Sequence, residues 1–151
     1  MTTHPGIRPR ILALDVGART IGLAVSDPLG LTAQGLATLR RTSKRADFGR
    51  LRRILQEYEV AEIVVGYPLR MSGEPGAQAQ KVAALAEDLR ARFGLPVHLW
   101  DERLTSVESG RVLWESEVSL QRRRQAVDRL AAVLILQSFL DHRSAARSGN
   151  C

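Results

Sequence analysis

The stretch from residue 11 to residue 27 constrains the fold of this chain more than any other. It contains two short apolar runs, Ile11–Leu14 and Ile21–Val25, with Gly17 in the connection between them and Gly22 at the start of the second run. Because glycine permits tight turns and close backbone approaches, this pattern predicts a β-hairpin. Asp15 directly follows the first run, although strand interiors avoid aspartate. It either caps the turn by accepting backbone N–H bonds or carries a buried charge that needs a cation or a metal.

Hydrophobic periodicity predicts alternating strands and helices along the rest of the chain. Ser43 has the side chain of a helix N-cap, and Gly94 followed by Pro96 is typical of a helix C-terminus. We expect residues 1–10 to form a loose N-terminal tail and residues 143–151 to form a loose C-terminal tail. The predicted elements between these tails are a third antiparallel strand at 33–39, a helix after Ser43 with Phe48, Leu51, Leu55 and Tyr58 on one face, a strand at 60–66, a loop at 67–76, a helix at 77–93, a strand at 97–100, a helix at 106–116 and a long, largely buried helix at 126–142.

This order of elements predicts an α/β fold in a single domain over residues 11–142. A three-strand antiparallel meander feeds parallel strands, and right-handed crossovers place those strands beside the first one. The result is a mixed central β-sheet with helices on both faces, a three-layer arrangement. In such sheets the active crevice lies at the carboxyl ends of the strands. Asp15 and the Asp101-Glu102 pair both lie at predicted strand ends.

The charge of the chain indicates a polyanionic partner. The 151 residues contain 22 Lys and Arg against 16 Asp and Glu, giving a net charge of +6, and Lys44 and Lys81 are the only lysines. The arginine guanidinium suits phosphate oxygens, so the composition is compatible with nucleic-acid binding. A GC-rich genome also favours arginine, which accounts for the Arg:Lys ratio but not for the net excess.

The sequence also indicates where the chain resides. No apolar run reaches the roughly 20 residues of a membrane-spanning helix, and the first ten residues lack an apolar signal core. The only cysteine is Cys151, so no intrachain disulfide can form. We therefore expect a cytoplasmic protein with no membrane partner.

Three acidic positions recur where an α/β fold builds its site. Besides Asp15 and Glu102, Asp128 lies near the start of the predicted last helix among apolar residues. Each has a simpler explanation: a turn cap for Asp15, an ion pair with Arg103 at a solvated strand end for Asp101 and Glu102, and a favourable contact with the helix dipole for Asp128. Their coincidence at one edge of the sheet instead indicates a carboxylate cluster, which needs positive charge between its members.

Oxygen ligands without cysteine or histidine pairs favour Mg²⁺ or Mn²⁺ over zinc. His4, His98 and His142 have no ligand spacing and fit a tail, a strand and a helix end. A carboxylate cluster holding one or two divalent ions on a basic protein suggests phosphodiester hydrolysis. One ion would activate water, and the other would stabilise the leaving oxygen.

Four blocks, at residues 15–27, 65–73, 101–106 and 127–137, resemble the YqgF family, also called RuvX. The blocks occur in the family's order, and the Asp101-Glu-Arg-Leu-Thr105 block is the most distinctive. The resemblance implies a ribonuclease H-like fold, with Asp15, Glu102 and Asp128 as the metal-binding catalytic carboxylates. It also implies a metal-dependent endonuclease acting on structured nucleic acid, in 5′-end processing of pre-16S ribosomal RNA or in resolution of four-way DNA (Holliday) junctions.

This chain departs from the family pattern at two positions. Arg19 keeps the basic charge of the first turn, but Thr20 replaces the second basic residue that usually follows it. Tyr67 stands where the family commonly has an aliphatic residue. If the missing arginine contacts phosphate, binding here is weaker or differently arranged.

Further arginines are candidates for contacts with the substrate backbone. They are Arg19 in the first turn, Arg70 in the loop at 67–76, Arg103 beside a carboxylate, and Arg122, Arg123 and Arg124 before the last helix. A solvated basic loop explains the last three equally well, and a plain connection explains the loop. Symmetric cutting of a junction needs two active sites, which favours a homodimer.

Two other functions remain open from the sequence. The same fold could serve as a binding module that has lost its activity. An Asp-x-Gly turn after a first strand also resembles the phosphate loop of actin-like sugar kinases, which need two such domains. No residue in the sequence distinguishes RNA from DNA as the substrate.

Overall fold

The computed structural model describes residues 9–105 and 120–148, and the side chains of 120–128 and 147–148 lie outside the description. The predicted helix at 106–116 and most of the N-terminal tail therefore fall outside the described residues. The described chain contains β1 (Arg10–Val16), β2 (Thr20–Ser26), β3 (Ala33–Gly35), β4 (Leu39–Arg40), α1 (Lys44–Glu57), β5 (Val60–Tyr67), α2 (Ala77–Phe93), β6 (Val97–Asp101), a 3₁₀ turn η1 (Glu102–Leu104) and α4 (Leu120–Ser148).

The strands form one mixed sheet in the order β3-β2-β1-β5-β6, with β4 also paired to β2. β1 and β2 pair antiparallel as the predicted hairpin, closed by a bond from the Gly17 amide to the Thr20 carbonyl (2.8 Å). β5 and β6 lie parallel to β1 and to each other. The sheet order places β5 between β1 and β6, so the two predicted acidic strand ends are separated by one strand.

The predicted third strand at 33–39 is wrong as a continuous element. β3 and β4 both pair antiparallel with β2, but Ala24 opposes Gly35 whereas Ile21 opposes Leu39. The third strand therefore carries one residue more than β2 between these two pairings. An extra residue on one side of an antiparallel pair is a bulge, which interrupts the ladder.

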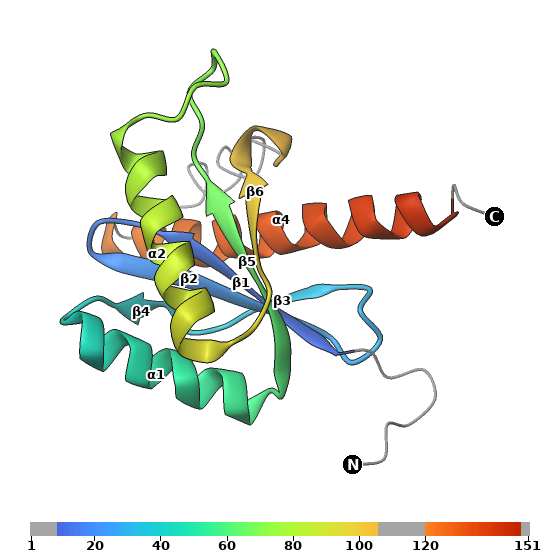
Figure 1. Ribbon diagram of the computed structural model, residues 1–151, viewed down its shortest axis with the longest axis horizontal. Coiled ribbons are helices and arrows are strands. Elements are labelled where there is room, and N and C mark those ends of the chain that lie inside the picture. Colours follow the sequence, from blue (N-terminus) through green and yellow to red (C-terminus); the bar gives the residue numbers. More distant parts are fainter. Residues whose placement is uncertain (1–8, 106–119, 149–151) are drawn as a thin grey trace.

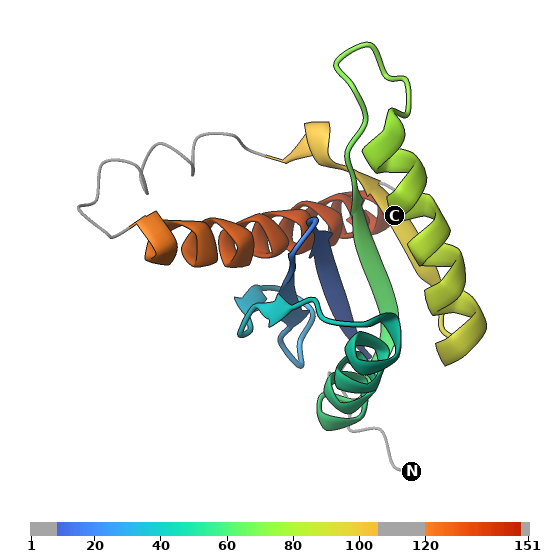
Figure 2. The same ribbon diagram turned by 90° about the vertical axis from the view of Figure 1, so that its left-hand side faces the viewer.

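Helices cover both faces of the sheet, which confirms the predicted three layers (Figures 1 and 2). Helices α1 and α2 pack on one face, where Leu12 and Leu14 of β1 point. Helix α4 crosses the other face, where Ile11 and Ala13 point. The two-residue alternation of a strand thus divides β1 between two cores.

The predicted helix caps are confirmed. The Ser43 hydroxyl accepts a bond from the Ala46 amide (3.2 Å) at the start of α1, and Gly94 ends α2 with φ of 66°. The last helix, however, begins at Leu120 and ends at Ser148 instead of spanning 126–142. Charged and polar residues such as those at 121–125 are good helix formers, so an apolar pattern alone starts the helix too late.

Helix α4 is also less completely buried than its composition predicts. Among its described residues, Ala132, Ile135, Leu136, Phe139 and Leu140 are buried, while Ala131, Val133 and Leu134 are only half-buried. No helix in the described ranges is both long and apolar enough to cross a membrane.

The core on the α1 and α2 side offers a matched stability test. Leu14 is 0% exposed, whereas Leu31, in the turn after β2, is 62% exposed. We expect Leu14→Ala to lower the free energy of unfolding by about 2–5 kcal/mol, because it removes buried apolar area and leaves a cavity. Leu31→Ala should change it by less than about 0.5 kcal/mol. Urea unfolding of both variants checks this, and equal effects would contradict the assignment of the core.

Candidate active site at the carboxyl edge of the sheet

Asp15 and Glu102 meet at the carboxyl edge of the sheet although β5 lies between their strands. Asp15 is the next-to-last residue of β1, and Glu102 opens the 3₁₀ turn directly after β6. The Glu102 carboxyl is hydrogen-bonded to the Asp15 side chain. A hydrogen bond between two carboxyl groups requires a proton on one of them, so the proximity of these two acids favours the protonated form of the pair when no cation lies between them.

Gly66 on β5 makes this contact possible. It pairs in register with Trp100 of β6, and a Cβ at this position would lie 2.6 Å from Glu102 Oε1 and 2.6 Å from Ile135 Cδ1. The Glu102 side chain thus passes over the backbone of β5 where no side chain stands in its way. From the sequence alone, Gly66 is only the last residue of a predicted apolar strand. A glycine inside a strand pattern is nevertheless a known signal of close approach.

The environment of Glu102 makes it an unusual acid. Burial raises the pKa of the Glu102 carboxyl, and the nearby charge of Asp15, the hydrogen bond to Asp15 and the charge of Asp101 raise it further, to about 7. The ordinary value is 4.5. The pair is therefore close to half-protonated at neutral pH, and a cation bound between the two carboxyls would remove the repulsion that keeps the proton there.

The 3₁₀ turn that carries Glu102 is held on both sides. The Thr105 amide and hydroxyl both donate to the Glu102 carbonyl, at 3.0 and 2.6 Å. Trp100, two residues earlier, donates through Nε1 to the Ser138 hydroxyl of α4 at 3.1 Å. These bonds fix the backbone at Glu102 relative to both β6 and α4.

Arg103 pairs with Asp101 and not with Glu102. Its guanidinium donates from Nε to Asp101 Oδ1 (3.0 Å) and from Nη2 to Asp101 Oδ2 (2.7 Å). These hydrogen bonds hold the pKa of the Asp101 carboxyl below its usual value. The ion pair considered for this strand end is thus confirmed for Asp101, while Glu102 faces Asp15.

The loop after β5 lies beside this ion pair. Gly73, with φ of 88°, approaches Arg103, whose Nη1 would lie 3.5 Å from a Cβ at that position. Arg70 is exposed and folds back over Gly76, with its Nε 2.7 Å from the position of a Cβ there. The loop is closed by a bond from the Gly73 amide to the Arg70 carbonyl (2.7 Å). It rises above the strand ends in Figure 1.

The first turn also carries a basic residue at this edge. Arg19 is exposed in the β1–β2 turn, and its carbonyl accepts a bond from the Arg41 amide (2.8 Å). Arg41 also donates from Nη1 to the Gly17 carbonyl (2.6 Å). The turn is thereby fixed against the chain that follows β4.

Asp128 and the three neighbouring arginines lie within α4, and their side chains are outside the described residues. Arg122, Arg123 and Arg124 belong to the helix itself, not to a loop before it as predicted. Because α4 begins at Leu120, Asp128 lies about two turns inside it. The helix-dipole explanation for Asp128 therefore loses its basis, since that effect fades beyond the first turn.

Among the described residues, no group of three or more histidine, cysteine or acidic side chains could hold a metal ion. The described part of the predicted cluster is the pair of Asp15 and Glu102. This pair fits a divalent cation in its chemistry, because both members are oxygen donors and their mutual repulsion is relieved by positive charge.

The fold and this acidic edge define a ribonuclease H-like α/β protein. A solved structure of T. thermophilus RuvC in complex with a Holliday junction substrate aligns with a TM-score of 0.54 at 19% identity, covering 94% of this chain and 97% of that one. A second Thermus thermophilus RuvC structure aligns with a TM-score of 0.50 at 13% identity, covering 89% and 96%. At these identities the likeness concerns the fold.

Sequence comparison supplies the family. The family model described as "RuvX: Holliday junction resolvase" matches residues 9–142. A protein of Koribacter versatilis named "Putative pre-16S rRNA nuclease" is 57% identical over 147 residues, covering 97% of this chain and 96% of that protein. A protein of Moorella thermoacetica with the same name is 54% identical over 132 residues, covering 87% and 94%. The chain belongs to the RuvX family, which confirms the resemblance found in its four sequence blocks.

The raised pKa of Glu102 predicts a pH-dependent effect on stability. The folded state binds more protons than the unfolded state between pH 4.5 and about 7, so wild-type stability should fall as pH rises through this window. Glu102→Gln removes this titration and keeps a hydrogen-bond donor toward Asp15. We compare the free energies of unfolding of the variant and the wild type in EDTA. Between pH 4.5 and pH 8 their difference should shift by roughly 1–3 kcal/mol in favour of the variant.

Urea unfolding at a series of pH values measures this difference. Added Mg²⁺ should restore wild-type stability at pH 8 and affect Glu102→Gln much less. A difference between the two proteins that stays constant across this pH range would contradict the coupling of Glu102 to Asp15.

Gly66 provides a second test, because it affects the site only by leaving space for the side chains of Glu102 and Ile135. Gly66→Ala should displace the Glu102 carboxyl or Ile135, lowering the free energy of unfolding by about 1–3 kcal/mol and weakening Mg²⁺ binding in calorimetry. Gly49→Ala is the matched control, since nothing lies within 4 Å of a Cβ at this position in α1. The control should be neutral or slightly stabilising. Wild-type Mg²⁺ affinity in Gly66→Ala would show that the close approach is irrelevant to the site.

Proposed function

We propose that this protein is a divalent-metal-dependent endonuclease that hydrolyses phosphodiester bonds in structured nucleic acid. The observation that carries the proposal is the Asp15–Glu102 contact across Gly66, which gathers two oxygen donors at the carboxyl edge of the sheet. Membership of the RuvX family and the names of the relatives support nucleic acid as the substrate. The net charge of +6 favours a polyanionic substrate as well.

We propose Asp15, Glu102 and Asp128 as the metal-binding catalytic residues. Position 128 precedes Ile135 by two turns, on the same face of α4, and Ile135 packs over Gly66. Mg²⁺ or Mn²⁺, two ions with substrate bound, would supply an activated water and stabilise the leaving oxygen. Glu102 would take up or release a proton near neutral pH, which suits a group that must be ionised to bind a cation.

The basic residues around this edge would hold the substrate backbone. Arg19 and Arg70 are exposed on the two loops beside the carboxylates. Arg103 keeps a position next to Glu102 through Asp101, and its side chain remains 39% exposed. Arg122, Arg123 and Arg124 lie in the first turns of α4, on the approach to Asp128. Charges of this kind position a nucleic acid without reading its sequence.

The proposed physiological substrate is the 5′ region of pre-16S ribosomal RNA, by analogy with the names of the relatives. The four-way DNA junction is the second substrate that we propose, by analogy with the description of the family. Symmetric cutting of a junction would require a homodimer, whereas trimming one RNA end would not.

Cleavage assays with both substrates test this proposal. Asp15→Asn and Asp128→Asn should each lower the cleavage rate by at least about a hundredfold, because an amide cannot replace a carboxylate ligand. Substrate affinity should change much less. Asp141→Asn, an exposed position in α4, is the control and should cleave at the wild-type rate. Cleavage that survives in both test variants would refute the site, and binding without metal-dependent cleavage of either substrate would indicate an inactive binding module.

A further inference from the structure

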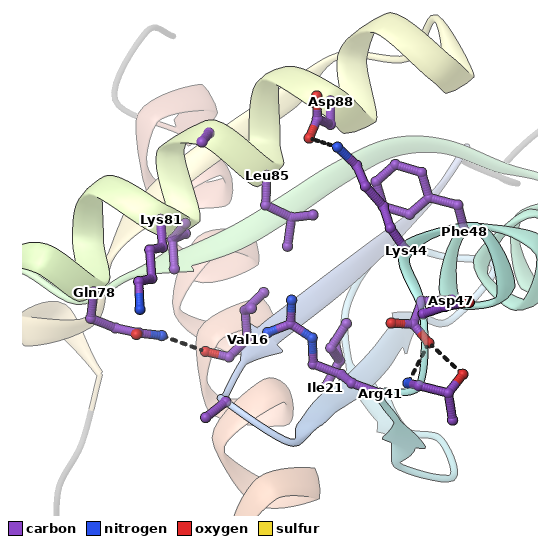
Figure 3. A pocket seen from close by; sticks show the side chains of 15 residues that line it. Val16, Ile21, Arg41, Lys44, Asp47, Phe48, Gln78, Lys81, Leu85 and Asp88 are labelled. Atoms are coloured by element: carbon purple, nitrogen blue, oxygen red, sulfur yellow. Dashed lines mark hydrogen bonds and ion pairs between the residues drawn. The ribbon is translucent and has the colours of Figure 1, made fainter.

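A hollow lies on the face of the sheet opposite α4, between α1 and α2 (Figure 3). Its volume is about 640 Å³, within the range of cavities that take small ligands. Val16, Ile21 and Leu85 line its apolar wall, and Arg41, Lys44 and Lys81 line its polar side. Both lysines of the chain are thus among its lining residues.

The hollow carries uncompensated positive charge. Its two acidic residues already have cationic partners: Asp88 pairs with Lys44 at 2.6 Å, and Asp47 pairs with Arg50 at 2.7 Å. Asp47 also accepts a bond from the Thr42 amide (3.0 Å). None of the residues that the structure describes forms an ion pair with Lys81. Lys81 therefore supplies charge that no neighbouring acid in the described ranges neutralises.

Arg41 adds a fixed cation on the side of the β1–β2 turn. Its guanidinium donates to the Gly17 carbonyl at 2.6 Å, which holds it at the end of β1. Gln78 of α2 donates to the Val16 carbonyl at 3.2 Å from the other side (Figure 3). Together with Lys81 these groups surround the end of β1 with hydrogen-bond donors.

The hollow begins one residue away from the carboxylate pair. Side chains alternate along β1, so Asp15 lies on the α4 side with Ile11 and Ala13, and Val16 lies on the opposite side with Leu12 and Leu14. The turn at 17–19 forms the ridge between the two. A strand with a phosphate at Asp15 and Glu102 would reach the hollow by crossing this turn.

We propose that the hollow binds one nucleotide of the substrate strand, adjacent to the cleaved bond, with its phosphate between Arg41 and Lys81 and its base against Val16 and Leu85. The charge, the half-apolar lining and the continuity with the carboxylate edge all fit a nucleotide. The identity of this occupant rests on the proposed function, because a nuclease at Asp15 brings the strand to this edge.

Two pairs of variants isolate the hollow. Lys81→Glu reverses its unneutralised charge, and Arg53→Glu makes the same change at an exposed position of α1 that does not line it. Ala84→Trp fills the hollow without changing charge, and Ala91→Trp places the same side chain at an exposed position of α2 outside it. Circular dichroism melting confirms that all four variants fold.

Fluorescence polarisation in EDTA then measures the affinity for a labelled pre-16S 5′-end RNA and a labelled four-way DNA junction. For whichever of the two nucleic acids the wild-type protein binds, Lys81→Glu and Ala84→Trp should each raise the Kd by about tenfold. The two control variants should raise it less than about twofold. The slope of log Kd against log salt should fall by about 0.7–0.9 for Lys81→Glu, as for the loss of one phosphate contact.

Test variants that bind substrate as tightly as their controls would overturn the proposal. It would also be overturned if AMP alone perturbed NMR signals of the hollow while substrate affinity stayed unchanged in the test variants, because the hollow would then be a separate mononucleotide site. The same experiments distinguish a failure of the nuclease proposal from a failure of this one. If the wild-type protein cleaves neither substrate but Lys81→Glu and Ala84→Trp weaken substrate binding, the nucleotide site stands and the nuclease proposal fails. If the wild-type protein cleaves substrate but these two variants bind it with wild-type affinity, the nuclease proposal stands and the nucleotide site fails.

Discussion

Two carboxyl groups that share a hydrogen bond across an intervening strand are the constraint on which the rest of this structure depends. Asp15 and Glu102 come from strands separated by β5, and their contact requires that β5 carry no side chain at Gly66. Such a pair is unfavourable at neutral pH without a proton or a cation, because burial and mutual repulsion both disfavour its charged form. The pair therefore lowers the stability of the folded protein, and a divalent ion bound between the two carboxyl groups would offset this loss.

The surrounding elements hold this pair in place. β1 ends in a turn that Arg41 and Gln78 hold from outside, and the 3₁₀ turn after β6 is fixed by Asp101, Thr105 and the neighbouring Trp100. Helix α4 closes the other side, with Ile135 against Gly66. The acidic edge therefore rests on strands, a helix and a short bonded turn, and the loops beside it carry the basic residues. A rigid acidic centre with basic surroundings suits a polyanionic substrate.

The sequence predicted those features that local chemistry determines. The hairpin at 11–27, the Ser43 cap and the Gly94 end of α2 depend on residues close together in the chain, and the structure confirms them. The alternation of apolar runs likewise gave the parallel strands and the three layers. The family blocks identified Asp15 and Glu102 as partners, and the structure brings these two together.

Features that depend on the exact register or contact between distant segments could not be predicted from the sequence. The bulge between β3 and β4 appears only when both are set against β2. The role of Gly66 depends on a side chain 36 positions later passing over it. Arg103 had two acidic neighbours in sequence, and only the geometry of η1 directs it to Asp101. The early start of α4 was missed because its first turns are polar, although they are compatible with a helix.

The most direct test of this account is a carbon-13 NMR titration of the Glu102 carboxyl in the full chain, with and without Mg²⁺. Without metal, we expect a pKa of about 7 for Glu102, with a matching titration step visible at Asp15 because the two groups are coupled. With saturating Mg²⁺, the Glu102 pKa should fall well below 7, because the ion favours the charged form. A Glu102 carboxyl that titrates near its ordinary 4.5 in both conditions would contradict the carboxylate pair and the metal site built on it.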